Sequence, residues 1–183
     1  MPLAVTAAIA APMLISAAPS ESDLALVQQH LQGVSSMTAG FAQTDRNGRT
    51  LTGTMTLKRP GKIRFQYEKG VPQLIVADGN SPLAVLLNPK RDIAKFARLV
   101  PTANPNVVSI EVHDSNHPEY GRITLIFQRS AAGPAGLMLQ GWVALDSQNN
   151  RTTIRLSNQH FNAAVSDGTF RWNDPRPKGR PNR

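Results

Sequence analysis

Between residues 51 and 67 the chain alternates apolar and polar side chains with the two-residue period of a β-strand. A turn at residues 59–62, Arg-Pro-Gly-Lys, divides the pattern into two strands. The recurring apolar-face positions are Leu51, Gly53, Met55, Leu57, Ile63, Phe65 and Tyr67. Because alternate side chains point to opposite faces of a strand, the pattern predicts antiparallel strands with one apolar face and one wet face. The function depends on what covers the apolar face.

The same pattern recurs along most of the chain. Further strands are predicted at residues 37–44, 73–78, 107–112, 122–129, 137–146 and 152–157. A short amphipathic helix is predicted at residues 23–33, where Leu24, Val27 and Leu31 recur at helical spacing and Gly33 ends the run. Short connections between roughly nine or ten strands predict a mainly β meander that curls into a barrel or half-barrel.

Residues 81–89 differ from the strands around them. Ser81 fits a helix N-cap, Pro82 the first helical position and Pro89 the exit. Five apolar residues stand between the two prolines: Leu83, Ala84, Val85, Leu86 and Leu87. The segment is too apolar for a surface helix and too short for a core helix, so we expect a lid or plug.

Composition favours one domain, since the chain has 183 residues of which 40% are hydrophobic. It has no Cys, which excludes disulfides and thiolate chemistry. Residues 1–18 are Ala-rich, uncharged and end in small residues, and we expect a signal peptide there. No Lys or Arg precedes this apolar run, which departs from the usual signal pattern.

The net charge of +8 and the pI of about 10.6 raise the possibility of nucleic-acid binding. Much of the excess lies in the Pro-rich C-terminal end, with Arg171, Arg176, Lys178, Arg180 and Arg183 against Asp174. Aromatic residues make up only 5% of the chain, too few for obvious stacking platforms. The distribution therefore favours a solvated or membrane-attracted tail, here residues 175–183.

No catalytic motif is present: the chain has no nucleophile elbow, phosphate loop or dinucleotide fingerprint. Two histidines and three carboxylates cluster in a polar stretch, and we expect a solvated hairpin loop rather than a metal site there: Glu111, His113, Asp114, His117 and Glu119. His30 and His160 are expected to be structural or exposed. We expect no enzyme activity, cofactor or metal, and single out Arg59, whose guanidinium offers five donors beside Pro60.

The order of several motifs resembles one known family. After the first helix come MTAGFAQ at residues 37–43, LKRPGKIRFQY at 57–67, QLIVADG at 73–79, SPLAVLL at 81–87 and TIRLSN at 153–158. These elements are similar to those of the periplasmic outer-membrane lipoprotein carrier family (LolA) of Gram-negative bacteria. The resemblance covers most of residues 19–174, and it implies an unclosed antiparallel β-barrel whose short helices form a lid over an apolar cavity.

The resemblance also implies a function. Such a carrier takes acylated lipoproteins from an inner-membrane ABC transporter and delivers them to the outer membrane, with or without a receptor there. Arg59, in the Arg-Pro pair, would bond to the lid and hold the cavity closed. We expect a monomer that binds no nucleic acid, with a cavity lined by Met55, Leu57, Ile63, Phe65, Leu74, Val76, Leu83, Leu86 and Leu87.

Two other functions stay open from the sequence. A periplasmic lipid or lipoprotein sensor with the same half-barrel would bind lipid without delivering it. A basic barrel that binds nucleic acid is the other alternative.

One feature departs from the family's pattern. In the family, Asp-Gly is followed by another pair of strands before the lid, whereas here Gly79 is followed directly by Asn80, Ser81 and Pro82. Two strands with their turns amount to roughly 15–20 residues. We therefore expect that a segment is missing from the sequence between Gly79 and Asn80, rather than from the protein.

Overall fold

The computed structural model describes residues 21–68, 72–73, 83–88, 90, 92–113 and 118–171. Within these residues one antiparallel sheet has the strand order β4-β3-β2-β1-β9-β8-β7-β6-β5. The strands are β1 (Ser36–Thr44), β2 (Thr50–Lys58), β3 (Lys62–Tyr67), β4 (Pro72–Gln73), β5 (Ala97–Val100), β6 (Val107–His113), β7 (Arg122–Arg129), β8 (Leu137–Leu145) and β9 (Arg151–Phe161). The helices are α1 (Glu21–Gly33), α2 (Ala84–Leu87), η1 (Ile93–Lys95), η2 (Pro118–Tyr120), η3 (Pro134–Gly136) and η4 (Asp167–Phe170).

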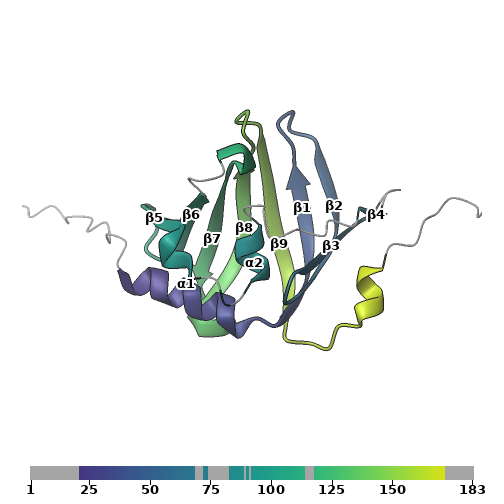
Figure 1. Cartoon of the computed structure of the whole chain (residues 1–183), viewed down its shortest axis with the longest axis horizontal. Helices are drawn as coiled ribbons and strands as arrows, with labels where there is room; N and C mark the ends of the chain where they lie inside the picture. The colour runs from purple at the N-terminus through teal and green to yellow at the C-terminus, as the bar shows by residue number, and fades with distance from the viewer. Residues whose placement is uncertain are drawn as a thin grey trace, which may run out of the picture.

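The sheet curls but does not close, because β4 and β5 form its two edges and do not pair with each other in the described structure. Figure 1 shows α1 crossing the lower end of the sheet and α2 lying in front of its middle strands. The fold is therefore mainly β, an unclosed antiparallel barrel with short helices over one face. This confirms the fold predicted from the alternation and the resemblance.

The alternation sorts side chains between two faces as expected. In β2 and β3, Met55, Leu57, Ile63 and Phe65 are at most 3% exposed and point to the concave face. The intervening side chains point to the convex face and are half-buried or exposed. Residues 51 and 67 continue the concave set to its rim.

Two irregularities in the ladder accompany the curl of the sheet. The register shifts between Ile126 and Phe127 where β7 pairs with β8, and again between Thr38 and Gly40 where β1 pairs with β9. Gly141, opposite the first shift, has φ +148, and a Cβ there would lie 2.0 Å from the Ile154 carbonyl oxygen. A bulge increases local twist, so these positions help the sheet to wrap around its apolar face.

Helix α1 packs on the sheet through Val27, Leu31 and the buried side chain of His30. His30 Nδ1 lies 2.9 Å from the Pro134 carbonyl oxygen, and since a carbonyl only accepts, this nitrogen donates. The rings of Phe127 and Phe161 stand edge-on to the imidazole at 5.2 and 6.0 Å. Burial, assisted by the positive charge of Arg59, lowers the pKa of His30.

The segment after β9, residues 162–171, crosses the convex side of β2 and β3 as a strap (Figure 1). Lys58 and Lys62 both donate to the Asp167 carboxylate, at 2.8 and 2.9 Å, and lower the pKa of that carboxyl to about 2. Arg64 Nη1 donates to the Thr169 carbonyl at 2.6 Å. Basic side chains on the convex face therefore bind the strap to β2 and β3.

The structure departs from the sequence prediction in several places. Strand β5 was not expected, and β9 runs four residues beyond the predicted 152–157. The N-cap of α2 is Leu83 without a side-chain hydrogen bond, so the assignment of Ser81 was wrong. Residues 74–82, including Leu74, Val76, Gly79 and Asn80, lie outside the described residues. No helix of the described residues is long and apolar enough to cross a membrane.

His30 predicts a specific dependence of stability on pH. The unfolded chain protonates this histidine near its ordinary pKa of 6.5, whereas the folded protein takes up the proton only at lower pH. The contribution of neutral His30 is complete above pH 6.5 and is lost as the pH falls through the lowered pKa. Urea unfolding should therefore show a falling free energy of unfolding from about pH 7 to about pH 5.

The matched variants are His30→Phe, which should lose this part of the pH dependence, and His160→Gln, which should keep it because His160 is exposed. The lowered pKa values of Asp45, Asp146 and Asp167 affect stability only toward and below pH 3.8 and leave this window clear. Equal slopes for the wild type and His30→Phe would show that His30 is not the group responsible.

Candidate functional site

The concave face and the lid form a single apolar cluster. The described residues expected to line a cavity all belong to that cluster or pack against it: Met55, Leu57, Ile63, Phe65, Leu83, Leu86 and Leu87. The structure brings them together from β2, β3 and α2, although the lid lies some 20 residues beyond β3 in sequence.

Lid helix α2 is a single turn whose four side chains are all buried. Leu86 is 2% exposed and Leu87 3% exposed, and both contribute to the cluster beneath the lid. An isolated helix of one turn is unstable in water, since the entropy cost of nucleation exceeds the free energy gained from the hydrogen bonds of one turn. Packing on the concave face is therefore what keeps α2 folded.

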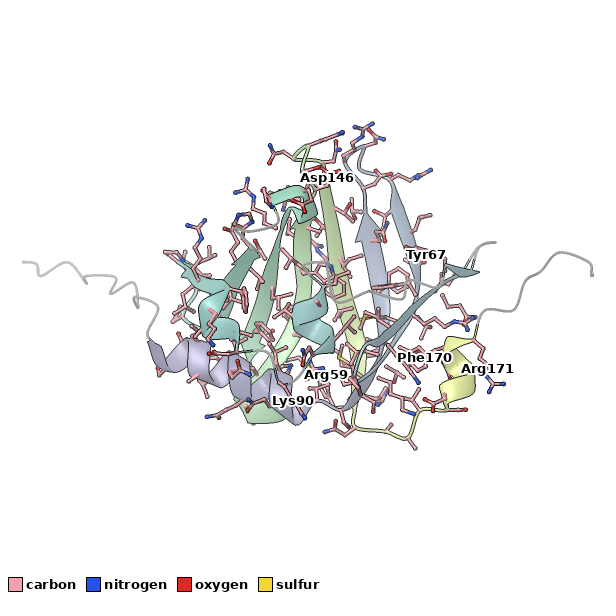
Figure 2. The ribbon with its side chains drawn as sticks, viewed as in Figure 1. Arg59, Tyr67, Lys90, Asp146, Phe170 and Arg171 are labelled. Carbon is pink, nitrogen blue, oxygen red and sulfur yellow. The ribbon has the colours of Figure 1, made fainter. Side chains whose placement is uncertain are left out.

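Arg59 joins the lid to the rest of the fold. Its Nε donates to the Leu86 carbonyl at 2.7 Å and its Nη1 donates to the Val34 carbonyl, just after α1, at 2.8 Å. The backbone of the same turn adds the Gly61 N–H, which donates to the Leu87 carbonyl at 3.1 Å. In Figure 2, Arg59 lies directly below α2, beside the end of α1. The hydrogen bond to the lid that the sequence led us to expect is thus present.

The electrostatics of Arg59 are those of a half-buried cation held by dipoles. Burial lowers its pKa to about 10, which still leaves the guanidinium charged at neutral pH. Among the described residues its recorded hydrogen-bond acceptors are carbonyl oxygens, and no carboxylate pairs with it. The hold on the lid therefore consists of charge-assisted hydrogen bonds rather than an ion pair.

The described conformation is closed over the apolar face. Two pockets lined by described residues are one of about 640 Å³ beside β5 and β6 and one of about 340 Å³ between α1 and η1. A ligand that used the concave face would have to displace the lid. The candidate site thus consists of the apolar concave face and the lid helix α2 that covers it.

Of the polar cluster singled out in the sequence, the structure describes Glu111, His113 and Glu119. Glu111 accepts two hydrogen bonds from Arg98, and His113 Nδ1 lies 3.3 Å from the Gly121 carbonyl. Asp114 and His117 lie outside the described residues. No group of metal-ligating side chains is found among the residues that the structure describes.

The cavity residues predicted from the sequence omit the far half of the apolar face. Alternate residues of β6, β7 and β8 complete the concave lining: Val108, Ile110, Val112, Ile123, Leu125, Phe127, Leu139 and Trp142. Their alternation was visible, but the curl that turns them toward α2 was not. The polar pair Gln43 and Tyr67 at the rim was also missed, although both stand at concave-face positions of their strands.

Comparison with known proteins finds a family whose model matches most of this chain. The model of the family "Outer membrane lipoprotein carrier protein LolA" matches residues 32–82 and 79–173. The two parts meet at residues 79–82, where the sequence suggested that a pair of strands is lacking.

Individual relatives carry the same description. An outer-membrane lipoprotein carrier protein of Legionella pneumophila is 38% identical over 64 residues, so that the match spans 33% of this chain and 32% of the relative. One from Pseudomonas putida is 26% identical over 187 aligned positions, covering 88% of this chain and 87% of the relative. Because 88% of 183 residues is fewer than 187, the relative has residues in the aligned region without counterparts here.

A partial likeness to solved structures exists as well. In the complex of MucA and MucB from Pseudomonas aeruginosa, the matching chain has a TM-score of 0.45 and 12% identity, over 83% of this chain and 61% of that chain. The family assignment rests on the sequence match, which takes in most of the described residues. The chain belongs to the outer membrane lipoprotein carrier protein LolA family.

Proposed function

We propose that this protein is a periplasmic carrier that shelters the acyl chains of lipoproteins on its concave face and delivers them from the inner to the outer membrane. The observation that carries the proposal is the continuous apolar face covered by a one-turn lid, with Arg59 bonded to the lid's carbonyl. The family and the names of its relatives support the lipoprotein as cargo.

The energetics of acyl chains favour such a carrier. Burial of a chain contributes about 0.8 kcal/mol per CH₂, so one 16-carbon chain costs about 13 kcal/mol to expose to water. A lipoprotein with several chains therefore cannot cross an aqueous compartment unprotected. An apolar half-barrel with a detachable cover meets that need without making or breaking any covalent bond, which is why we propose a carrier and not an enzyme.

The route follows from the same proposal. An inner-membrane ABC transporter would load the carrier, and the outer membrane, with or without a receptor, would take up the cargo. Residues 1–18 would direct export, residues 19–174 would form the carrier domain and residues 175–183 a basic tail. A sensor with the same fold would bind lipid but deliver nothing, and the two are separated by the cellular test below.

Arg59 would act as the latch of the lid. In the closed form its guanidinium connects the end of α1, the β2–β3 turn and α2. Cargo that enters under α2 would break the bond to Leu86, and release of the cargo would let the bond form again. The closed state would thus be stable enough to exclude water and weak enough to open.

Ligand binding gives a direct test of the proposed carrier function. A fluorescent acyl probe should bind the purified protein, and Leu86→Arg should bind it several-fold more weakly because a charge then lies in the apolar cluster. Ala94→Arg, at an exposed position of η1, is the control and should bind like the wild type. Circular dichroism checks that each variant is folded, and Leu86→Ala provides a milder change should the arginine variant fail to fold.

In cells, depletion of the protein should leave lipoproteins stranded at the inner membrane, measured by fractionation of the two membranes. Normal sorting after depletion would favour the sensor over the carrier. Failure of the wild-type protein to bind any acyl probe would reject both.

Loss of the latch gives another prediction. Arg59→Leu should remove two charge-assisted hydrogen bonds, worth about 1.5–3 kcal/mol, and raise the population of the open lid. Hydrogen exchange should then be faster at the amides that report lid closure, Gly61, Leu86 and Asn88. Arg98→Leu, which removes an exposed arginine paired with Glu111, should leave these amides unchanged. Equal exchange in wild type and Arg59→Leu would show that the lid does not depend on this residue.

A further inference from the structure

A row of aromatic rings lies along the concave face and ends at its rim. Ring centroids are 6.2 Å apart for Trp142 and Phe65, 5.2 Å for Phe65 and Phe41, and 5.1 Å for Phe41 and Tyr67, all edge-to-face. The rings come from β8, β3 and β1, so the row spans the concave face. Its outer end is Tyr67, the last residue of β3, at the opposite end of that strand from Arg59 (Figure 2).

Gly53 fixes the position of the outer two rings. It pairs with Phe41 on one side and with Tyr67 on the other, so the two rings meet over its missing side chain. A Cβ at this position would lie 2.8 Å from Phe41 Cε1 and 2.1 Å from the Gln66 carbonyl oxygen. The gap left by glycine therefore holds the Tyr67 ring against Phe41, with its hydroxyl directed past the apolar row.

The hydroxyl of Tyr67 meets the first polar side chain of the concave face. Tyr67 Oη donates to Gln43 Oε1 at 2.7 Å, and both residues are half-buried. Burial raises the pKa of Tyr67, so the phenol stays neutral and keeps its proton for this bond. With that bond made, the Gln43 amide N–H₂ and a lone pair of Tyr67 Oη have no recorded partner among the described residues. The pair therefore offers donors and an acceptor at the end of an apolar track.

Leu51 marks the boundary from the other side. It lies directly opposite Gln43 in the β1–β2 ladder and is 41% exposed, the largest exposure of a large apolar side chain in the described structure. A polar side chain, Gln43, and an exposed apolar side chain, Leu51, thus lie opposite each other at the rim. This is the arrangement needed by a ligand that has long apolar chains joined through ester or amide groups to a polar body.

We propose that the Gln43 amide, held in place by Tyr67, binds the ester or amide carbonyls that link acyl chains to the cargo, while the chains extend inward along the aromatic row toward Trp142. The inference rests on the proposed function and adds to it a site that binds the ester or amide group rather than the hydrocarbon chain. Gln43 donates its amide N–H₂ to a carbonyl, and Tyr67 holds the amide in that orientation. Bound carbonyls would fix how deeply the chains enter.

The test compares two probes on the same full-length mature protein. One is a synthetic lipopeptide with a diacylglyceryl cysteine, which has both chains and linkages; the other is diphenylhexatriene, a fluorescent hydrocarbon without either linkage. The variants are Tyr67→Phe, which loses only the hydroxyl, and Gln43→Met, which keeps the length of the side chain. Gln66→Met, on the convex face of β3 and exposed, is the control.

We expect both rim variants to bind the lipopeptide about 3- to 10-fold more weakly and the hydrocarbon as tightly as the wild type. Unchanged lipopeptide affinity would overturn the linkage site while leaving the carrier function intact. An equal loss of affinity for both probes would also overturn it, since Gln43 and Tyr67 would then only stabilise the sheet. Failure of the wild type to bind either probe would reject the proposed function itself.

Discussion

Two helix ends and one turn of the sheet meet at the guanidinium of Arg59, and the closed form of the protein depends on that meeting. Carbonyl groups in the last turn of a helix and just beyond it lack partners within the helix, and they carry the negative end of its dipole. Arg59 supplies hydrogen bonds to such carbonyls at Val34 and Leu86, and the neighbouring Gly61 N–H supplies one to Leu87. The planar fork of an arginine can reach two acceptors in different elements at once, which the single ammonium of a lysine does less well.

In the proposed carrier, the choice of carbonyls as partners matters because the lid would have to open. A buried cation paired with a carboxylate is costly to separate, whereas dipoles hold the cation more weakly. The apolar part of the cover is also modest: Val85, Leu86 and Leu87 each contribute about 1.5–3 kcal/mol by burial. One acyl chain of 16 carbons contributes about 13 kcal/mol, so a bound chain can replace the lid over the concave face. In these terms the lid and the cargo are alternative covers for one surface.

The alternation of β2 and β3 was enough to predict strands, faces and the hairpin, because a period of two is a local property of the chain. Strand β5 was missed because its four residues, including Arg98, show no clear alternation, and it forms only by pairing with β6. The cap at Leu83 was assigned to Ser81 because a serine before a proline is a strong local signal, and tertiary packing overrides such signals. Arg59 was singled out from its position beside Pro60, and its bond to the lid was implied by the resemblance. The contact between Tyr67 and Gln43 depends on register across three strands, which no local pattern contains.

Strand β3 connects two polar groups that differ in charge and in the partners they bind. At its start the β2–β3 turn carries Arg59, a charged group that acts on the protein's own lid; at its end Tyr67 carries a neutral hydroxyl at the rim. Ile63 and Phe65 lie between them on the concave face, fully covered in the closed form. A strand of six residues spans roughly 17–20 Å, so the two groups are too far apart to touch one another. The proposed opening at one end and the proposed recognition at the other would therefore vary independently, while the same strand keeps the apolar surface between them in a fixed register.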